Sequence, residues 1–153
     1  MQRLKHSVLL LLGFIILFSS CTQKTGVSWE KYEPEKLVAA QLSKMPVVLD
    51  FYADWCIPCK ELEHYTYTNP EVIKAFDGFR RFKIDIDRAD EKGVSELVSH
   101  FNVEGVPTVI FLDADGKEVP NTRIEGFVPP TQMIALLHSI QMMRGEPEPQ
   151  QEP

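Results

Sequence analysis

The chain has 153 residues, 44% of them hydrophobic and 25% charged, and it carries a formal net charge of −6. This size and composition indicate a single globular domain with a conventional hydrophobic core. The acidic balance argues against a nucleic-acid-binding protein, which usually presents a basic face to the phosphates. We therefore expect proteins or small molecules as partners, and no nucleic acid.

Residues 1–20 have the pattern of an export signal. Arg3, Lys5 and His6 form a short basic start, and residues 7–20 form an uncharged run that is mostly apolar. As a helix this run would measure about 21 Å, which is too short to cross a hydrocarbon core of about 30 Å. It also lacks the polar face of a helix packed on a domain surface. We predict a cleaved signal peptide and an exported mature chain.

The end of this signal, FSSC at positions 18–21, resembles the lipobox of bacterial lipoproteins. That motif usually has Leu where Phe18 stands, whereas the small residues before Cys21 agree with it. The resemblance implies lipid attachment to Cys21, and ordinary cleavage that leaves a free Cys21 is the alternative. The chain has 3 cysteines, and an odd number in an exported protein leaves one to be explained. Lipidation of Cys21 would leave Cys56 and Cys59 as a self-contained pair.

The rest of the chain divides by composition into three parts. Residues 21–28 form a short polar tether, residues 29–143 the folded domain, and residues 144–153 an acidic, proline-rich tail that we expect to be disordered. A lipidated chain would be a membrane-anchored lipoprotein of the bacterial envelope that faces the periplasm. Thr22 after the lipidated cysteine favours the outer membrane over the inner membrane, and a monomer is the default expectation.

Hydrophobic patterning and capping residues predict the elements of the folded domain. In chain order we expect a helix over 35–42, a strand over 46–52, helices over 56–65 and 70–76, a strand over 79–85, a helix over 90–101, strands over 108–112 and 118–125, and a helix over 130–143. Pro120 makes the last strand an edge, because proline donates no ladder hydrogen bond. Strands that alternate with helices and end in a hairpin predict an α/β fold, with a central mixed β-sheet flanked by helices on both faces.

Cys56 and Cys59 are the candidate catalytic pair. The apolar strand over 46–52 feeds a turn, and the turn opens a helix at Cys56. The first N–H groups of a helix lack intrahelical partners and stabilise an anion, so we expect Cys56 to be the attacking thiolate. Cys59 lies one turn deeper on the same helix face and can resolve a mixed disulfide on Cys56.

Two other interpretations of this pair stay open. A purely structural disulfide is one, although so small a loop would restrict the unfolded chain little. Half of a metal site is the other, with His64, His100 and His138 as available ligands, but no second CxxC or paired-histidine motif accompanies it. A CxxCH haem signature is absent, because Lys60 follows the second cysteine. We therefore predict no metal, and no cofactor beyond the redox-active disulfide itself.

The segments VVLDFYADWCIPCK at positions 47–60 and GVPT at positions 105–108 resemble the two landmark motifs of the thioredoxin superfamily. These landmarks are the active-site strand with its helix, and the cis-proline loop. The longer match, over 50–68 and 103–127, is most similar to the C-terminal periplasmic domain of the DsbD family of thiol–disulfide interchange proteins. The resemblance implies a thioredoxin fold and thiol–disulfide oxidoreductase activity, here in a stand-alone lipoprotein.

The resemblance also implies roles for five residues around the pair. Asp50 would be a buried carboxylate with a raised pKa that exchanges a proton with the resolving cysteine through water. Glu63 would be a second carboxylate acting on the pair, or else a solvated helix residue. Pro107 would follow a cis peptide bond, and Val106 would offer backbone groups to an extended substrate. Trp55 would shield the attacking sulfur, or else serve only in packing.

The leading hypothesis is a reductase of disulfides in other exported proteins, supplied with electrons by a membrane donor of DsbD type. Pro58, directly before Cys59, favours a reducing couple by the same resemblance. An oxidase or isomerase on the same fold is the first alternative. A non-enzymatic envelope lipoprotein that uses the fold as a binding module is the second.

Overall fold

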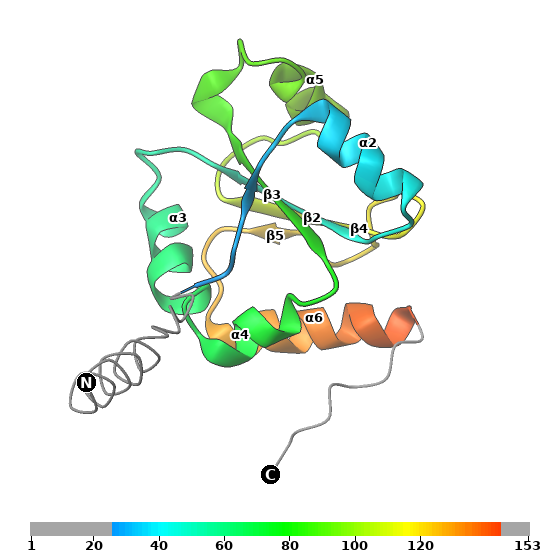
Figure 1. Cartoon of the computed structure of the whole chain (residues 1–153). Coiled ribbons are helices and arrows are strands. Elements are labelled where there is room, and N and C mark those ends of the chain that lie inside the picture. Colours follow the sequence, from blue (N-terminus) through cyan, green and yellow to red (C-terminus); the bar gives the residue numbers. More distant parts are fainter. Residues whose placement is uncertain (1–25, 145–153) are drawn as a thin grey trace, which may run out of the picture.

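The structure, a computed structural model, describes residues 26–144. The predictions for the signal peptide, for Cys21 and for the acidic tail fall on residues 1–25 and 145–153, outside the described residues, so they stay predictions, as do the domain boundaries. Figure 1 shows a central sheet with helices on both of its faces. The predicted α/β architecture is confirmed.

The sheet has five strands in the order β1-β3-β2-β4-β5. They are β1 (Glu30–Lys31), β2 (Val47–Tyr52), β3 (Arg80–Asp85), β4 (Thr108–Leu112) and β5 (Ile124–Glu125). Strands β1 and β2 run parallel to β3, whereas β4 runs antiparallel to β2 and β5 antiparallel to β4. The mixed sheet therefore brings the C-terminal ends of β1, β2 and β3 to the same end of the molecule.

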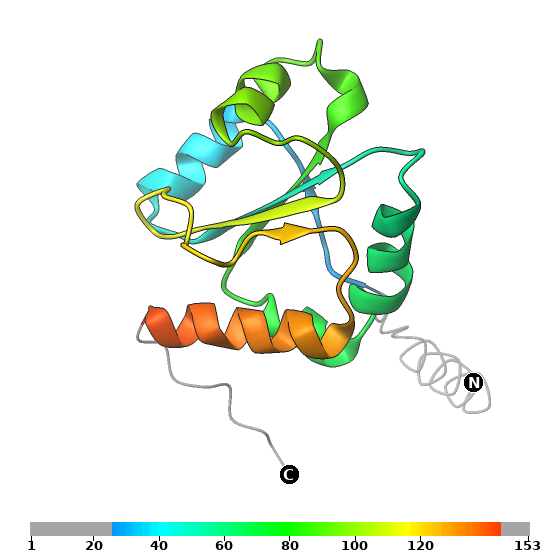
Figure 2. The ribbon, with the colours of Figure 1, turned by 180° about the vertical axis from the view of Figure 1, so that it is seen from behind.

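Helices form one layer on each face of the sheet (Figures 1 and 2). The first layer holds α2 (Pro34–Leu42) and α5 (Val94–His100). The second layer holds α3 (Ile57–Glu61), the π-helix η1 (Leu62–Thr66), α4 (Pro70–Ala75) and α6 (Pro130–Met143). Each layer closes over its own hydrophobic core, so both faces of the sheet are buried.

The central position of β2 explains why its sequence is almost continuously apolar. Strand side chains alternate between the two faces, and here helices cover both faces. Val47, Leu49 and Phe51 pack in the core of the first layer, whereas Val48 packs in the core of the second. Asp50 shares the orientation of Val48, so its carboxylate points towards the layer that contains α3.

The predicted helix over 90–101 is too long at its start. The structure has a 3₁₀ turn, η2 (Ile86–Arg88), and α5 begins only at Val94. Gly93 precedes that helix with a left-handed φ of 81°, a conformation that no α-helix contains and that glycine adopts without strain. Residues 90–92, which the prediction included in the helix, therefore lie outside it.

Two further elements differ from prediction by more than a terminal residue, and strand β1 was not predicted. The helix over 56–65 divides into α3 and η1, with Cys56 as its N-cap residue. The strand over 118–125 is reduced to β5 and one isolated bridge at Glu118, in keeping with the interruption at Pro120. Strand β1 was missed because two residues carry no recognisable alternation. Within residues 26–144, no helix is both long enough and apolar enough to span a membrane.

Candidate active site

Cys56 and Cys59 form a disulfide at the start of α3, with their Cα atoms 5.3 Å apart. Cys56 is the N-cap residue of this helix, in extended backbone conformation, and its Sγ accepts a hydrogen bond of 3.1 Å from the Cys59 N–H. The sulfur of Cys56 therefore takes the place of the oxygen acceptor that usually caps a helix. The same amide can stabilise negative charge on Cys56 once the disulfide is reduced.

A tight turn and a proline set the start of this helix. The Cys56 N–H donates to the Ala53 carbonyl at 3.1 Å, which closes the turn after β2. Pro58 lies in the first turn of α3, where its missing N–H removes no intrahelical hydrogen bond. The pair is thus fixed at the C-terminal end of the central strand.

The cis-proline loop lies against the disulfide. The Val106–Pro107 peptide bond is cis, as the resemblance implies. Val106 packs against the small cluster of Ala53, Cys56 and Cys59, and Pro107 is anchored through its carbonyl, which accepts from the Gly126 N–H at 3.0 Å.

Two large apolar side chains next to Cys56 are exposed to solvent. Trp55 is 64% exposed and Ile57 is 70% exposed, on either side of the buried Cys56. Such a surface next to a reactive pair is suited to contact with another protein. The shielding role of Trp55 stays a prediction.

Asp50 lies in β2 on the face that carries α3, and its side chain is almost completely buried. It stands opposite Lys83 of β3 in the parallel register, and the Lys83 Nζ is 3.5 Å from its Oδ2. Burial raises the pKa of Asp50, and the positive charge of Lys83 offsets part of that rise. The buried Tyr67 hydroxyl faces the same carboxylate without forming a well-aligned hydrogen bond, and burial, together with the nearby Asp50, raises the pKa of Tyr67.

Glu63 lies on η1 and is about half exposed, with 44% of its side chain accessible. It forms an ion pair with Lys83, so the ammonium lies between the Asp50 and Glu63 carboxylates. The same ammonium lies 4.5 Å from the centre of the Tyr52 ring. Glu63 is thus linked to Asp50 through Lys83, and its direct action on the cysteines stays a prediction.

Lys83 was missed by sequence reasoning. Phe82 and Ile84 on either side of it enter the core of the first layer, so alternation alone would place Lys83 on the opposite face. Alternation does not reveal which residue of β2 stands opposite Lys83. Only the register of β2 against β3 brings Lys83 to Asp50.

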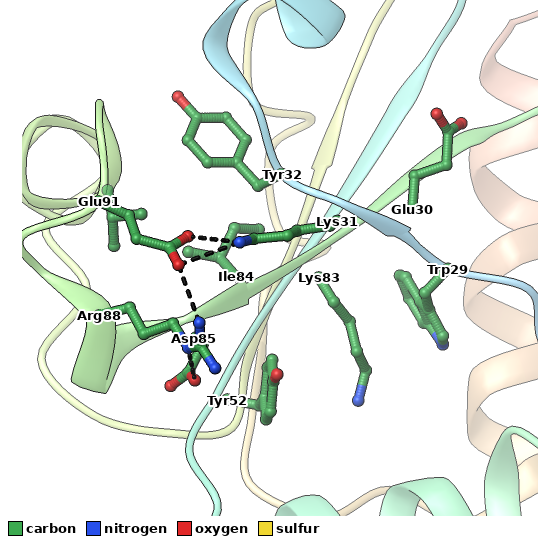
Figure 3. Close-up of a pocket in the computed structure, with 11 residues that line it drawn as sticks. Trp29, Glu30, Lys31, Tyr32, Tyr52, Lys83, Ile84, Asp85, Arg88 and Glu91 are labelled. Carbon is green, nitrogen blue, oxygen red and sulfur yellow. Dashed lines mark hydrogen bonds and ion pairs between the residues drawn. The ribbon is translucent and has the colours of Figure 1, made fainter.

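A cavity of about 350 Å³ lies beside the site, between β1, β3 and the turn η2 (Figure 3). Tyr52 lines this cavity and also packs against the disulfide cluster, whereas neither cysteine lines it. Lys83 points into its lower part, between Tyr52 and Trp29 (Figure 3). Across residues 26–144, no group of three or more His, Cys, Asp or Glu side chains is placed to hold a metal ion.

Comparison with known proteins agrees with this geometry. The thioredoxin-like domain family matches residues 33–141. The thiol:disulfide interchange protein DsbD of Cronobacter sakazakii is 44% identical over 100 residues, which are 65% of this chain and 17% of the relative. DsbD of Haemophilus ducreyi is 42% identical over 106 residues, or 69% of this chain and 18% of the relative. The chain thus spans less than a fifth of the length of these curated relatives.

Solved structures give the same result. The C-terminal domain of Neisseria meningitidis DsbD in its oxidised form superposes with a TM-score of 0.58 and 28% identity, covering 73% of this chain and 98% of that domain. A thioredoxin from Thermus thermophilus superposes with a TM-score of 0.63 and 23% identity, covering 78% of this chain and 91% of that protein, which supports the fold alone. The expected thioredoxin fold and the resemblance to DsbD are confirmed.

Proposed function

We propose, on the premise that this chain belongs to the thioredoxin-like family and is a thiol–disulfide oxidoreductase, that it reduces disulfides in other exported proteins. The observation that carries the proposal is the Cys56–Cys59 disulfide at the start of α3, with the Cys56 sulfur at the helix N-terminus. A helix N-terminus favours a thiolate, and the thiolate is the attacking species in disulfide exchange. Disulfide-containing proteins are therefore the expected exchange partners.

The proposed reaction begins with the reduced pair. The Cys56 thiolate attacks one sulfur of the substrate disulfide, and that bond breaks as the other substrate sulfur leaves as a thiolate. Cys59 then loses its proton and attacks the Cys56 sulfur, which expels the second substrate thiolate. The two substrate thiolates take up protons, and two electrons have passed from the pair to the substrate. The Cys56–Cys59 disulfide that remains is the state in the structure.

Asp50 is proposed as the proton acceptor for Cys59. Its carboxylate faces the layer that contains α3, and burial raises its pKa towards the range in which a carboxyl group can exchange protons near neutral pH. The positive charge of Lys83 lowers the pKa of Asp50 and so favours the ionised form. Val106 and Pro107 are proposed to hold an extended segment of the substrate beside the pair.

Trapping of the mixed disulfide tests this function directly. In Cys59→Ser the attacking cysteine remains and the resolving cysteine is gone, so substrates should accumulate on Cys56 as covalent adducts that mass spectrometry can identify. Cys56→Ser is the matched control and should trap no partner. Equal recovery of proteins from both variants, or from neither, would contradict the mechanism.

The reducing direction has a separate test. A midpoint potential close to about −270 mV, like that of thioredoxin, would support a reductase, whereas one near about −120 mV would indicate an oxidase. The measurement is the equilibrium of the Cys56–Cys59 pair with glutathione or dithiothreitol buffers of known ratio. Pro58 before Cys59 supports the reductase by resemblance to thioredoxin.

The location and the electron source are also proposals. The basic and apolar residues 1–20 and the FSSC segment support export and lipid attachment at Cys21, with the mature protein facing the periplasm from the outer membrane. A membrane protein of DsbD type is the proposed electron donor. Radiolabelled palmitate should enter the wild-type chain and not Cys21→Ser, and label in both or in neither would contradict lipidation at this residue.

A further inference from the structure

Arg123 connects the segment between β4 and β5, residues 113–123, with the end of α5. Its Nε and Nη2 donate to the two carboxylate oxygens of Glu118 at 2.8 and 2.7 Å, a paired geometry that fixes the guanidinium. From this position Nη2 also donates to the Phe101 carbonyl at 2.9 Å. Phe101 is the residue that ends α5. One side chain thus ties a helix of the first layer to the residues beside β5.

Local structure explains why Arg123 points towards α5. Ile124 packs in the core of the second layer, and side chains alternate along a strand, so its neighbour Arg123 is directed to the face of the first layer. The last carbonyls of a helix have no intrahelical partner. Arg123 therefore supplies a donor that α5 itself cannot provide.

Helix α5 is followed directly by the cis-proline loop, residues 102–107. Among the described residues, the N–H and C=O groups of residues 104–106 make no backbone–backbone hydrogen bond. A single side-chain bond, from Thr108 Oγ1 to the Gly105 carbonyl at 2.7 Å, lies within this stretch. The backbone of Val106, whose side chain packs against the disulfide cluster, is therefore open to a partner. The path of the loop depends on what holds its two ends.

Both ends of the loop are held by one short segment, residues 123–126. The first two loop amides bond back to α5, so the start of the loop moves with the helix end. Arg123 fixes that helix end through the Phe101 carbonyl. At the other end of the loop, the Gly126 N–H donates to the Pro107 carbonyl at 3.0 Å. The edge of the sheet at β5 thus clamps the loop on both sides.

We propose that Arg123 is a positioning residue, which holds the end of α5 so that the cis-proline loop presents the Val106 backbone to a substrate strand beside Cys56. The inference rests on the proposed oxidoreductase function. A loop that occupied several positions would bind substrate only in the competent one, and the apparent affinity would fall by that fraction. The effect should therefore appear in the KM for protein substrates, and the exchange chemistry of the pair should change little.

Arg80 offers a matched comparison. Its Nε and Nη2 both donate to Glu30 at 2.8 Å, and 30% of its side chain is exposed, against 26% for Arg123. Arg80 begins β3, at the end of the sheet where β2 also begins, whereas the disulfide follows the other end of β2. The two arginines make similar ion pairs, and they differ in their distance along the fold from the cis-proline loop.

Arg123→Met removes the donor groups and keeps an unbranched side chain. With insulin as the protein disulfide and dithiothreitol as reductant, it should raise KM roughly 3- to 10-fold at nearly constant kcat. Arg123→Lys keeps one cationic group without the planar fork, so its KM should rise less. Arg80→Met should stay within about twofold of wild type.

A small substrate separates loop positioning from a general loss of activity. Hydroxyethyl disulfide cannot dock as an extended segment, so its reduction should change by less than about twofold in all three variants. An unchanged KM for insulin in Arg123→Met would overturn the proposal. An equal rise in Arg80→Met, or an equal loss with both substrates, would overturn it as well.

Amide signals report on the loop independently of activity. In Arg123→Met the ¹⁵N–¹H signals of Gly105 and Val106 should shift or broaden, because the loop exchanges between positions. The signal of Gly78, in the turn before β3, should stay in place and shows that the chain is folded. Arg123→Lys should give a smaller change of the same kind, and Arg80→Met should leave both loop signals in place. Loop signals with unchanged positions and widths in Arg123→Met would refute the proposal.

The two sets of measurements fail separately. A wild-type chain that reduced neither insulin nor hydroxyethyl disulfide would contradict the proposed function. The spectra of Arg123→Met would still show whether Arg123 holds the cis-proline loop.

Discussion

Asp50 and Lys83 show how a neighbouring positive charge acts on a buried carboxylate. Burial raises the pKa of Asp50, because a carboxylate loses its hydration in the core. Lys83, which is partly exposed, supplies a positive charge at 3.5 Å and is itself paired with Glu63. The pKa of Asp50 is therefore raised by one effect and lowered by the other, with burial the larger.

Asp50→Asn should stabilise the folded chain at neutral pH. Because the pKa of Asp50 is higher in the folded than in the unfolded state, its contribution to stability is fully present below the unfolded pKa and is lost as pH rises through the folded pKa. We expect the free energy of unfolding of Asp50→Asn to exceed that of wild type by about 1–2 kcal/mol at pH 7 and by little at pH 3. Urea denaturation across this range measures the difference.

The control for this prediction is Asp115→Asn, which alters an exposed carboxylate in the turn after β4. Its stability relative to wild type should not show the same rise with pH. Loss of stability in Asp50→Asn at pH 7, or a gain that is equal at both pH values, would contradict the assigned cause.

Lys83→Met should move the pH dependence of turnover. Without the ammonium, the pKa of Asp50 rises further, and the carboxylate that we propose as the acceptor of the Cys59 proton forms only at higher pH. The acidic limb of the pH–rate profile for insulin reduction should therefore shift to higher pH. Lys44→Met, which removes a lysine from a distant surface pair, should leave the profile in place. A shift to lower pH would be incompatible with Lys83 acting on Asp50.

Short helices in this fold depend on their first residues for stability. Helix α4 follows Asn69, whose side-chain oxygen accepts from the N–H groups of Glu71 at 2.9 Å and Val72 at 3.2 Å. Pro70 takes the first helical position, where no N–H is needed. Together these residues define the start of a helix with few turns of its own.

Asn69→Ala should lower the free energy of unfolding by about 1 kcal/mol, because two helix amides lose their acceptor. Asn69→Asp keeps a side-chain acceptor at the same position and should remain within about 0.5 kcal/mol of wild type. Guanidinium denaturation of the oxidised proteins provides the comparison. Equal losses in the two variants would show that the cap contributes nothing.

Alanine substitutions at Gly93 and Gly78 test whether close packing, in addition to backbone conformation, requires glycine before α5. Both have left-handed φ, 81° and 85°, so alanine at either should destabilise by about 1–2 kcal/mol. A Cβ at Gly93 would also lie 2.6 Å from Cγ of Pro34, whereas at Gly78 it would meet nothing within 4 Å. Thermal melting should therefore give a lower Tm for Gly93→Ala than for Gly78→Ala, and the reverse order would refute the steric argument.

Elements whose ends are marked by nearby residues in the sequence were predicted well. Elements and contacts that depend on residues distant in the sequence were not. Strand β4 and helix α6 have the bounds expected from sequence, because turn residues and proline mark their ends. Strand β1 forms by pairing with the edge of β3. The residue that stands opposite Asp50 is set by the register of β2 against β3. The cysteine pair could be recognised from spacing, whereas the pairing of Lys83 with Asp50 required the assembled sheet.

At the scale of the whole molecule, stability is divided between two cores that share one sheet. Leu137 of α6 is fully buried in the core of the second layer, whereas Met142 near the end of the same helix is largely exposed. The layer that supports the active-site helix thus depends on α6, although α6 contributes no residue to the disulfide cluster.

Leu137→Ala should lower the free energy of unfolding by about 2–5 kcal/mol, because it leaves a cavity in a packed core. Met142→Ala should change it by less than about 0.5 kcal/mol. Denaturant titration of both variants measures the contrast. A similar small change in both would mean that α6 is not an integral part of the fold.

The alternation of β2 also limits how related chains can vary in length. Asp50 faces α3 only because it stands an even number of positions from Val48, and a deletion of one residue before it would exchange the two faces. An apolar side chain would then replace the carboxylate on the face that carries α3, and a charge would enter the first layer. We expect insertions and deletions in homologues to be confined to connecting loops such as residues 113–117, while the interval from Val47 to Cys56 keeps a constant length.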